Sequence, residues 1–291
     1  MTRHLALLLP VVACLSGCSR NQVAWEQSAR EEKAVKSIEA LGGSVYWEWV
    51  DWEDSSSTWS VITVRLSGPK VTDSDLKDLK ELKGLQELNL YCTKITDAGL
   101  KDLKKLKSLQ ELYLEDTKIT DAGLKDLEEL KDLRALGLGR TQITDAGMKD
   151  LKALKGLRVL DLNCTQITDA GLKDLKELKG LQELYLFGTH ITDAGLKELK
   201  ELQDLQELNL AYTQITDAGL KDLKELKGLK TLSLWRTQIT DAGLKDLEEL
   251  KGLQELDLGG TKITNAGLKD LKQALPKTSI FFSLIPDGPE R

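Results

Sequence analysis

Residues 85–108 read LQELNLYCTKITDAGLKDLKKLKS, and this stretch decides the fold because the chain repeats it. The same pattern begins again every 24 residues, at Leu109, Leu133, Leu157, Leu181, Leu205, Leu229 and Leu253. A fixed period in this range predicts a stacked array of repeats and not a single globular core. Each unit directs seven apolar residues inward. No unit buries them alone, but stacked neighbours can.

Each 24-residue unit divides into two halves. Positions 3–7 alternate in polarity, as Glu-Leu-Asn-Leu-Tyr does in the first copy, which predicts a strand. Positions 12–23 read TDAGLKDLKELK in most copies and predict a helix with Thr as its cap and Asp near its positive end. Leucines at positions 16, 19 and 22 then lie along one helix face, and Gly at position 15 is expected to permit close packing.

The unit resembles the leucine-rich repeat, and its Ile-Thr-Asp-Ala-Gly-Leu half is similar to the cysteine-containing subtype found behind F-box domains. That resemblance implies an α/β solenoid, a curved right-handed parallel β/α array with helices outside and strands on the concave side. Thr stands at position 9, where the family usually has Asn or Cys, and its hydroxyl is expected to bond the backbone of a neighbouring turn. The subtype also suggests an F-box-like ubiquitin-ligase adaptor, but residues 19–60 are too short and too Trp-rich for an F-box.

The array is expected to cover residues 61–276. Residues 61–84 form a degenerate first repeat, and Pro276 ends the last helix. Ile280 and Phe282 then supply a final strand, within a C-terminal cap of residues 277–291. One strand per repeat and this final strand give about ten strands.

Residues 1–17 have the layout of a secretory signal, with Arg3 followed by an apolar run of 11 residues. That run is too short to cross a bilayer, which takes about 20 residues. Leu15-Ser16-Gly17-Cys18 resembles the bacterial lipobox, which implies cleavage before Cys18 and lipidation of that residue. Residues 18–24 are then a lipidated polar tether, and the protein is anchored in the bacterial cell envelope, at the outer membrane or the periplasmic face. An ordinary signal peptide with a chance cysteine is the alternative.

Residues 25–60 precede the array and are rich in tryptophan. The pattern predicts a helix from Trp25 to Leu41, ended by Gly42-Gly43, and a hairpin of strands near 45–50 and 59–66. One interpretation is an N-terminal cap that covers the leucine face of the first repeat. The other is a stacking platform for cell-wall glycan or peptide, made by Trp25, Trp47, Trp49, Trp52 and Trp59.

Composition argues against several function classes. The net charge of −6 and pI near 5.3 leave no basic footprint for nucleic acid. The four cysteines form no CxxC pair, and Cys92 and Cys164 fall three turns apart, so they are predicted to be free thiols. His190 replaces Lys or Gln at position 10 and is predicted to lie on the surface. The row of aspartates at position 13 suits helix starts better than a calcium ladder. We therefore expect no enzyme activity, no cofactor and no metal.

Differences between the copies collect at positions 5, 7 and 8. Every Phe, Trp and Tyr between residues 67 and 276 falls in these columns, and with Arg236 they are the candidate ligand-binding residues: Tyr91, Tyr113, Tyr185, Phe187, Tyr212 and Trp235. Tyr, Trp and Arg commonly anchor interfaces, although exposed strand positions also tolerate aromatics. A hot spot is expected where Tyr185, Phe187 and Tyr212 adjoin Trp235 and Arg236. The sequence thus predicts a non-catalytic scaffold that binds an unknown protein or peptide on its concave face.

Overall fold

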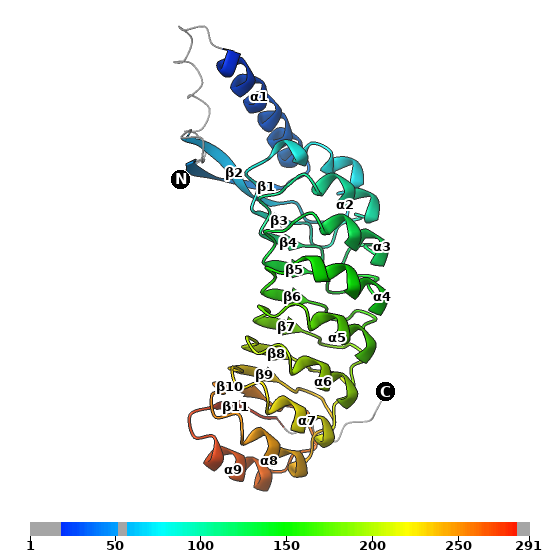
Figure 1. Cartoon of the computed structure of the whole chain (residues 1–291), viewed down its shortest axis with the longest axis vertical. Helices are drawn as coiled ribbons and strands as arrows, with labels where there is room; N and C mark the ends of the chain where they lie inside the picture. The colour runs from blue at the N-terminus through cyan, green and yellow to red at the C-terminus, as the bar shows by residue number, and fades with distance from the viewer. Residues whose placement is uncertain (1–18, 52–56, 284–291) are drawn as a thin grey trace.

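A single sheet runs the length of the molecule in the computed structural model, which describes residues 19–51 and 57–283 (Figure 1). Its eleven strands follow one another in chain order. They are β1 (Ser44–Asp51), β2 (Ser57–Arg65), β3 (Glu87–Asn89), β4 (Glu111–Tyr113), β5 (Ala135–Gly137), β6 (Val159–Asp161), β7 (Glu183–Tyr185), β8 (Glu207–Asn209), β9 (Thr231–Ser233), β10 (Glu255–Asp257) and β11 (Ser279–Phe281). This order is that of a solenoid, in which each turn pairs with the next.

Strands β2 to β11 pair in parallel with a register of one repeat, so that Glu87 lies beside Glu111 and Leu88 beside Leu112. The expected ten-strand parallel array is therefore confirmed. The eleventh strand is β1, which pairs with β2 antiparallel as the predicted hairpin. Because β2 also pairs with β3, the hairpin and the array share a strand. The repeat strands are shorter than expected and span positions 3–5, not 3–7.

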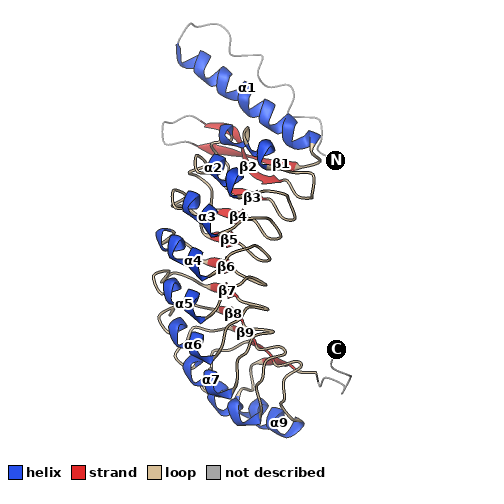
Figure 2. Ribbon diagram, turned by 90° about the vertical axis from the view of Figure 1, so that its right-hand side faces the viewer, coloured by secondary structure: helices blue, strands red, loops and turns tan. Residues whose placement is uncertain are grey.

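Short helices return the chain from each strand to the next. The α-helices are α1 (Ser19–Ala40), α2 (Asp97–Leu103), α3 (Asp121–Leu124), α4 (Asp145–Met148), α5 (Asp169–Leu175), α6 (Asp193–Leu199), α7 (Asp217–Leu223), α8 (Leu244–Leu247) and α9 (Asn265–Ala274). The 3₁₀ turns are η1 (Asp73–Leu76), η2 (Leu79–Glu81), η3 (Lys125–Leu127), η4 (Lys149–Ala153) and η5 (Asp241–Gly243). Figure 2 shows the repeat helices along one side of the curved array, opposite the strands. The strands line the inner side of the curve, as expected.

The core is a continuous column of leucine and isoleucine between the sheet and the helices. In the third clean copy, Leu133, Leu136 and Leu138 are buried together with Ile143. Thr at position 9 is buried too, and its hydroxyl donates to the position-6 carbonyl of its own repeat, as Thr93 does to Leu90 at 2.8 Å. The prediction that this hydroxyl bonds the backbone of a neighbouring turn is therefore wrong. The threonine side chain instead closes the bend that ends each strand.

The position-13 aspartates connect the repeats. Asp169 accepts the backbone N–H of Thr192 at 2.8 Å and its hydroxyl at 2.7 Å, and Thr192 in turn caps α6. The same pair of bonds joins eight successive aspartate–threonine pairs, from Asp73–Thr96 to Asp241–Thr264. Gly at position 15 lies so close that an added methyl, for example on Gly195, would overlap the Asp169 carboxylate. The glycine therefore permits the close stacking expected of it.

The N-terminal helix closes the first repeat. Ala34, Val35 and Ile38 of α1 are buried in the same core as the repeat leucines. The helix ends before Gly42, which has a φ of +83°, as the Gly42-Gly43 pair predicted. It begins at Ser19, so residues 19–24, expected to be a tether, are helical. Among the cap tryptophans, the structure describes the side chain of Trp47, which is 39% exposed. The glycan-platform interpretation stays a prediction.

No helix among the described residues is both long and apolar enough to cross a bilayer. The predicted signal and lipidation site, residues 1–18, lie outside the described residues.

Replacing Asp169 with Ala is expected to destabilise the array by about 2–3 kcal/mol, because two charge-assisted hydrogen bonds are lost and the Thr192 N–H loses its partner. Asn265 occupies the same position in the last repeat, is exposed, and precedes no further Thr at position 12. The Asn265→Ala control should change stability by about 0.5 kcal/mol or less. Urea unfolding of both variants measures the difference, and equal effects would contradict the connecting role.

Candidate functional site

Three aromatic rings and one guanidinium meet on the strand side of three adjacent repeats. The rings of Phe187 and Tyr212 lie 5.2 Å apart edge-to-face, and those of Tyr212 and Trp235 lie 4.8 Å apart in the same geometry. Arg236 stands 5.1 Å from the ring centres of both Tyr212 and Trp235 and donates a hydrogen bond to the Tyr212 hydroxyl. Edge-to-face pairs and cation–π contacts hold such groups in place. These four residues are called the aromatic cluster below.

Tyr185, also expected in the hot spot, is held by a polar contact of its own. Its hydroxyl donates to Glu183 Oε2 at 2.8 Å, and the described ring contacts do not include it. Burial raises the pKa of the Tyr185 phenol well above its usual range, and the hydrogen bond to Glu183 and the charge of Glu207 raise it further. Tyr185 is thus engaged by carboxylates on β7 and β8, beside the cluster but not part of it.

The remaining candidates lie nearer the N-terminus and are separate from the aromatic cluster. Tyr113 repeats the arrangement of Tyr185, since its hydroxyl donates to Glu111 Oε2 at 2.8 Å. Burial, then this bond, raises the pKa of the Tyr113 phenol. Tyr91 is 44% exposed. The seven candidates therefore share one face but divide into a cluster of four and three individual tyrosines.

Position 8 has a backbone conformation that sequence reasoning missed. All eight copies adopt a positive φ there, and six do so with a side chain: Cys92, Asp116, Arg140, Cys164, Tyr212 and Arg236, at 53–58°. Glycine holds the other two places, at Gly188 and Gly260. A left-handed conformation costs a non-glycine residue about 1–2 kcal/mol. The glycines at position 8 were the available signal. Two cluster members, Tyr212 and Arg236, are therefore held in place despite this cost.

Two carboxylates are also held in unusual surroundings on the strand side. Glu115 lies across Gly137, where an added methyl would overlap its carboxylate. Burial raises the pKa of Glu115, and the nearby charge of Asp161 raises it further. Burial likewise raises the pKa of Asp161. The glycines at positions 5 and 7 of this repeat, Gly137 and Gly139, were the sequence signal that the side chains of neighbouring repeats lie over β5.

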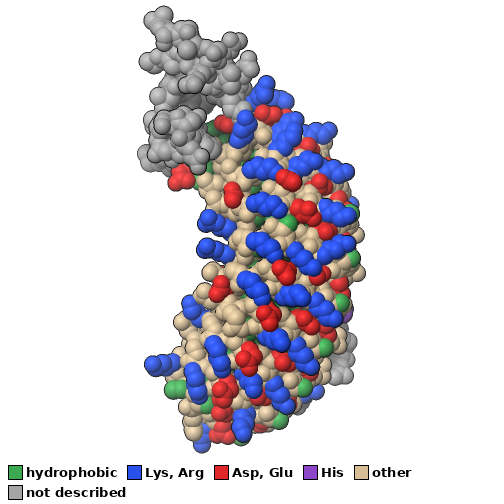
Figure 3. Space-filling model, in the orientation of Figure 1, with side chains coloured by type: hydrophobic (Ala, Val, Ile, Leu, Met, Phe, Trp, Pro, Cys, Tyr) green, Lys and Arg blue, Asp and Glu red, His purple; other side chains and the backbone are tan. Residues whose placement is uncertain are grey.

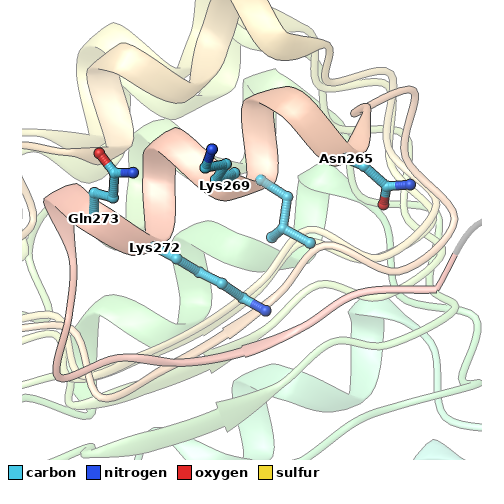
Figure 4. Close-up of a pocket in the computed structure, with 5 residues that line it drawn as sticks. Asn265, Lys269, Lys272 and Gln273 are labelled. Atoms are coloured by element: carbon cyan, nitrogen blue, oxygen red, sulfur yellow. The ribbon is translucent and has the colours of Figure 1, made fainter.

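Other chemical groups do not converge in the described part of the chain. His190 is exposed as predicted, and Cys92 and Cys164 are free thiols. No group of three metal-ligating side chains occurs within residues 19–51 and 57–283. A depression of about 380 Å³ lies on α9, lined by Asn265, Leu268, Lys269, Lys272 and Gln273 (Figure 4). It contains none of the candidate residues, and its lining offers no nucleophile beside a base.

The strain at position 8 can be measured with a matched pair of substitutions. Arg140→Gly should stabilise the protein by about 0.5–1 kcal/mol, because relief of the left-handed conformation exceeds the entropic cost of glycine. Arg236→Gly gives the same relief but removes two cation–π contacts and one hydrogen bond, so it should give no gain. Urea midpoints report both values. An equal gain in both variants would show that Arg236 contributes nothing to the cluster.

Comparisons with known proteins agree with this architecture. A family model for a leucine-rich repeat region matches residues 98–286, and a single leucine-rich repeat matches residues 85–104. No curated protein matches. Among solved structures, internalin C2 of Listeria monocytogenes is 26% identical with a TM-score of 0.54, over 87% of this chain and 92% of that one. A leucine-rich-repeat protein of Leptospira interrogans is 27% identical with a TM-score of 0.55, over 71% of this chain and 57% of its own length.

These matches show the fold and the repeat type. Proteins of this kind generally mediate protein–protein interactions on a scaffold that is generally non-catalytic. The matched region covers more than half of the chain. The protein therefore belongs to the leucine-rich-repeat family.

Proposed function

We propose that this protein is a non-catalytic scaffold that binds a protein or peptide on the concave face of its repeat array. The scaffold residues are nearly the same in every copy, whereas positions 5, 7 and 8 differ from repeat to repeat. Ten turns stacked at about 4.8 Å, each presenting positions 3–7 over roughly 15 Å, offer about 700 Å², near one partner's share of a standard interface. The family's general role in protein interaction supports the same proposal.

The observation that carries the proposal is the aromatic cluster. Phe187, Tyr212, Trp235 and Arg236 form an ordered surface, and Tyr212 remains 41% exposed at its centre. Aromatic and arginine side chains that are already held in position lose little entropy on binding and commonly dominate interface energies. Two of these residues retain an unfavourable backbone conformation that glycine would relieve. A binding role explains why side chains are kept there.

The Phe187→Ala, Tyr212→Ala and Trp235→Ala triple variant tests the site. Crosslinking capture from native envelopes, quantified by mass spectrometry, should recover at least about tenfold less of the partner that the parent protein captures. Lys173→Ala removes an exposed side chain of α5 on the helix side and should leave the yield unchanged. Urea unfolding confirms that both variants are folded. Undiminished capture by the triple variant would contradict the site.

We propose further that the scaffold is anchored in the cell envelope through Cys18. The motif Leu15-Ser16-Gly17-Cys18 after an apolar run supports this. Stable anchoring of a protein takes more than one acyl chain, because a single one binds a membrane only reversibly. Intact-mass analysis of the purified protein should show a mature chain that starts at Cys18 and carries three acyl chains. In the Cys18→Ala variant the protein should leave the membrane fraction. An unmodified thiol at Cys18 would contradict the anchor.

A further inference from the structure

Charges on the helix side of the array compensate each other between repeats. Lys107, Lys155 and Lys179 each pair with a glutamate of the following repeat, at 2.9, 3.1 and 3.0 Å respectively. Lys152 pairs with Asp174 in the same sense at 2.8 Å. Figure 3 shows the resulting surface, in which basic and acidic side chains alternate closely over the helices. These four pairs thus offset charge between neighbouring repeats on this side.

Charges on the strand side are not compensated in this way. Position 3, at the start of each strand, holds glutamate in five of the eight clean copies: Glu87, Glu111, Glu183, Glu207 and Glu255. Arg65 pairs with Glu87 at 3.2 Å. Within the described residues, no lysine or arginine lies at ion-pair distance from Glu111, Glu115, Glu183 or Glu207. The concave face therefore presents unpaired negative charge.

The unpaired carboxylates form two similar patches. On β4, Glu111-Leu112-Tyr113 holds a phenol against a carboxylate, and Glu115 lies nearby. On β7, Glu183-Leu184-Tyr185 repeats the arrangement, with Glu207 of β8 beside the same phenol. We call these the first and second acidic patches. Between them the position-3 residues Ala135 and Val159 carry no charge, and the carboxylate on these two strands, Asp161, is half-buried with its pKa raised by burial.

The distance between the patches defines what fits across them. Strands β4 and β7 are three places apart in the sheet, which corresponds to about 14 Å at 4.8 Å per strand. An extended chain lying across the strands advances about 3.3–3.6 Å per residue, so four residues span that distance. The spacing thus favours two separated cations, one at each acidic patch.

We propose that the concave face binds an extended, basic segment of its partner protein, in which two Lys or Arg side chains about four residues apart each meet one acidic patch. The inference rests on the proposed function, since it names the chemistry of the partner that the same face binds. The second patch lies on β7 and β8, next to the aromatic cluster. A segment seated on both patches therefore ends beside Phe187 and Tyr212, where its apolar side chains have a surface to contact.

Selection from a random peptide library tests the inference. Phage displaying peptides of about 16 residues, long enough when extended to cross all ten parallel strands, are selected against the full chain in detergent. The Kd of each recovered peptide is then measured by fluorescence anisotropy at about 50 and 300 mM NaCl. Recovered peptides should carry Lys or Arg pairs about four residues apart. Their affinity should fall at least about tenfold at the higher salt, as expected of partly exposed charges.

A matched pair of double variants separates the patches from general charge. Glu183→Gln with Glu207→Gln should weaken binding about tenfold or more, because a desolvated ion pair is lost. Glu225→Gln with Glu249→Gln removes the same charge from exposed residues just after α7 and α8, and should change the Kd less than about twofold. Moving one cation next to the other in a selected peptide should weaken binding as much as the Glu183/Glu207 variant does.

Three outcomes overturn the inference: recovery of neutral or acidic peptides, equal effects of the two double variants, or no recovered peptide. The proposed function is judged separately by envelope capture with the aromatic triple variant. If that capture is lost while basic peptides fail to bind, the concave face binds a partner of other chemistry. If basic peptides bind through the acidic patches while the triple variant captures normally, the inference holds and the aromatic cluster is not the binding site.

Discussion

The stacking of this array depends on one interaction, the double hydrogen bond from each position-13 aspartate to the position-12 threonine of the next repeat. One carboxylate oxygen takes the threonine N–H and the other takes its hydroxyl, at 2.6–2.8 Å throughout the array. The threonine is also the helix cap, so the same bonds fix where each helix starts. Glycine at position 15 leaves room for that carboxylate. The start of each helix is thereby tied to the repeat before it.

The aspartate–threonine connection, the leucine core and the position-15 glycine fix the fold. The exposed side chains on the strand side can therefore vary without loss of that fold. Its side chains vary from copy to copy without changing the backbone. This freedom gives glutamates at the start of β7 and β8, and aromatic groups at Phe187, Tyr212 and Trp235, just after β7, β8 and β9. The helix side varies less and neutralises its own charge. The molecule thus has one side suited to solvent and one suited to a partner, which is the basis of the binding proposal.

Most of the fold was predictable from the sequence because the repeat states each requirement eight times. The period, the buried leucines, the helix cap and the close approach at Gly195 and its equivalents all follow from residue types that admit one physical reading. The left-handed backbone at position 8 is hard to predict from the sequence, because six of its eight residues are not glycine and only Gly188 and Gly260 signal it. The helix was predicted to start at Trp25, but α1 starts at Ser19. Residues 19–24 are polar and show no helical spacing of apolar residues, so the sequence does not reveal this first part of the helix.

The candidate site was predictable in place but not in detail. Alternation in the strands was enough to put Phe187 and Trp235 on one face, whereas Tyr212 at position 8 is out of phase with that alternation and was grouped with them by its variability. Sequence spacing could not show that Tyr185 bonds to Glu183, because the two residues are neighbours on the same strand face and their side-chain directions depend on packing. It also could not show which charges pair between repeats, as Lys107 does with Glu129 on the helix side. Those contacts arise from which side chains face each other across the stacked turns.

The central claim is that the concave face, at the aromatic cluster, is where a partner binds. Site-specific photocrosslinking tests it most directly, with a photoreactive benzoylphenylalanine placed at Phe187 in one protein and at exposed Lys173 on α5 in another. Illumination of native envelopes should give a discrete crosslinked adduct from position 187 and none from position 173. An adduct from position 173 alone, or none from either position, would contradict the account.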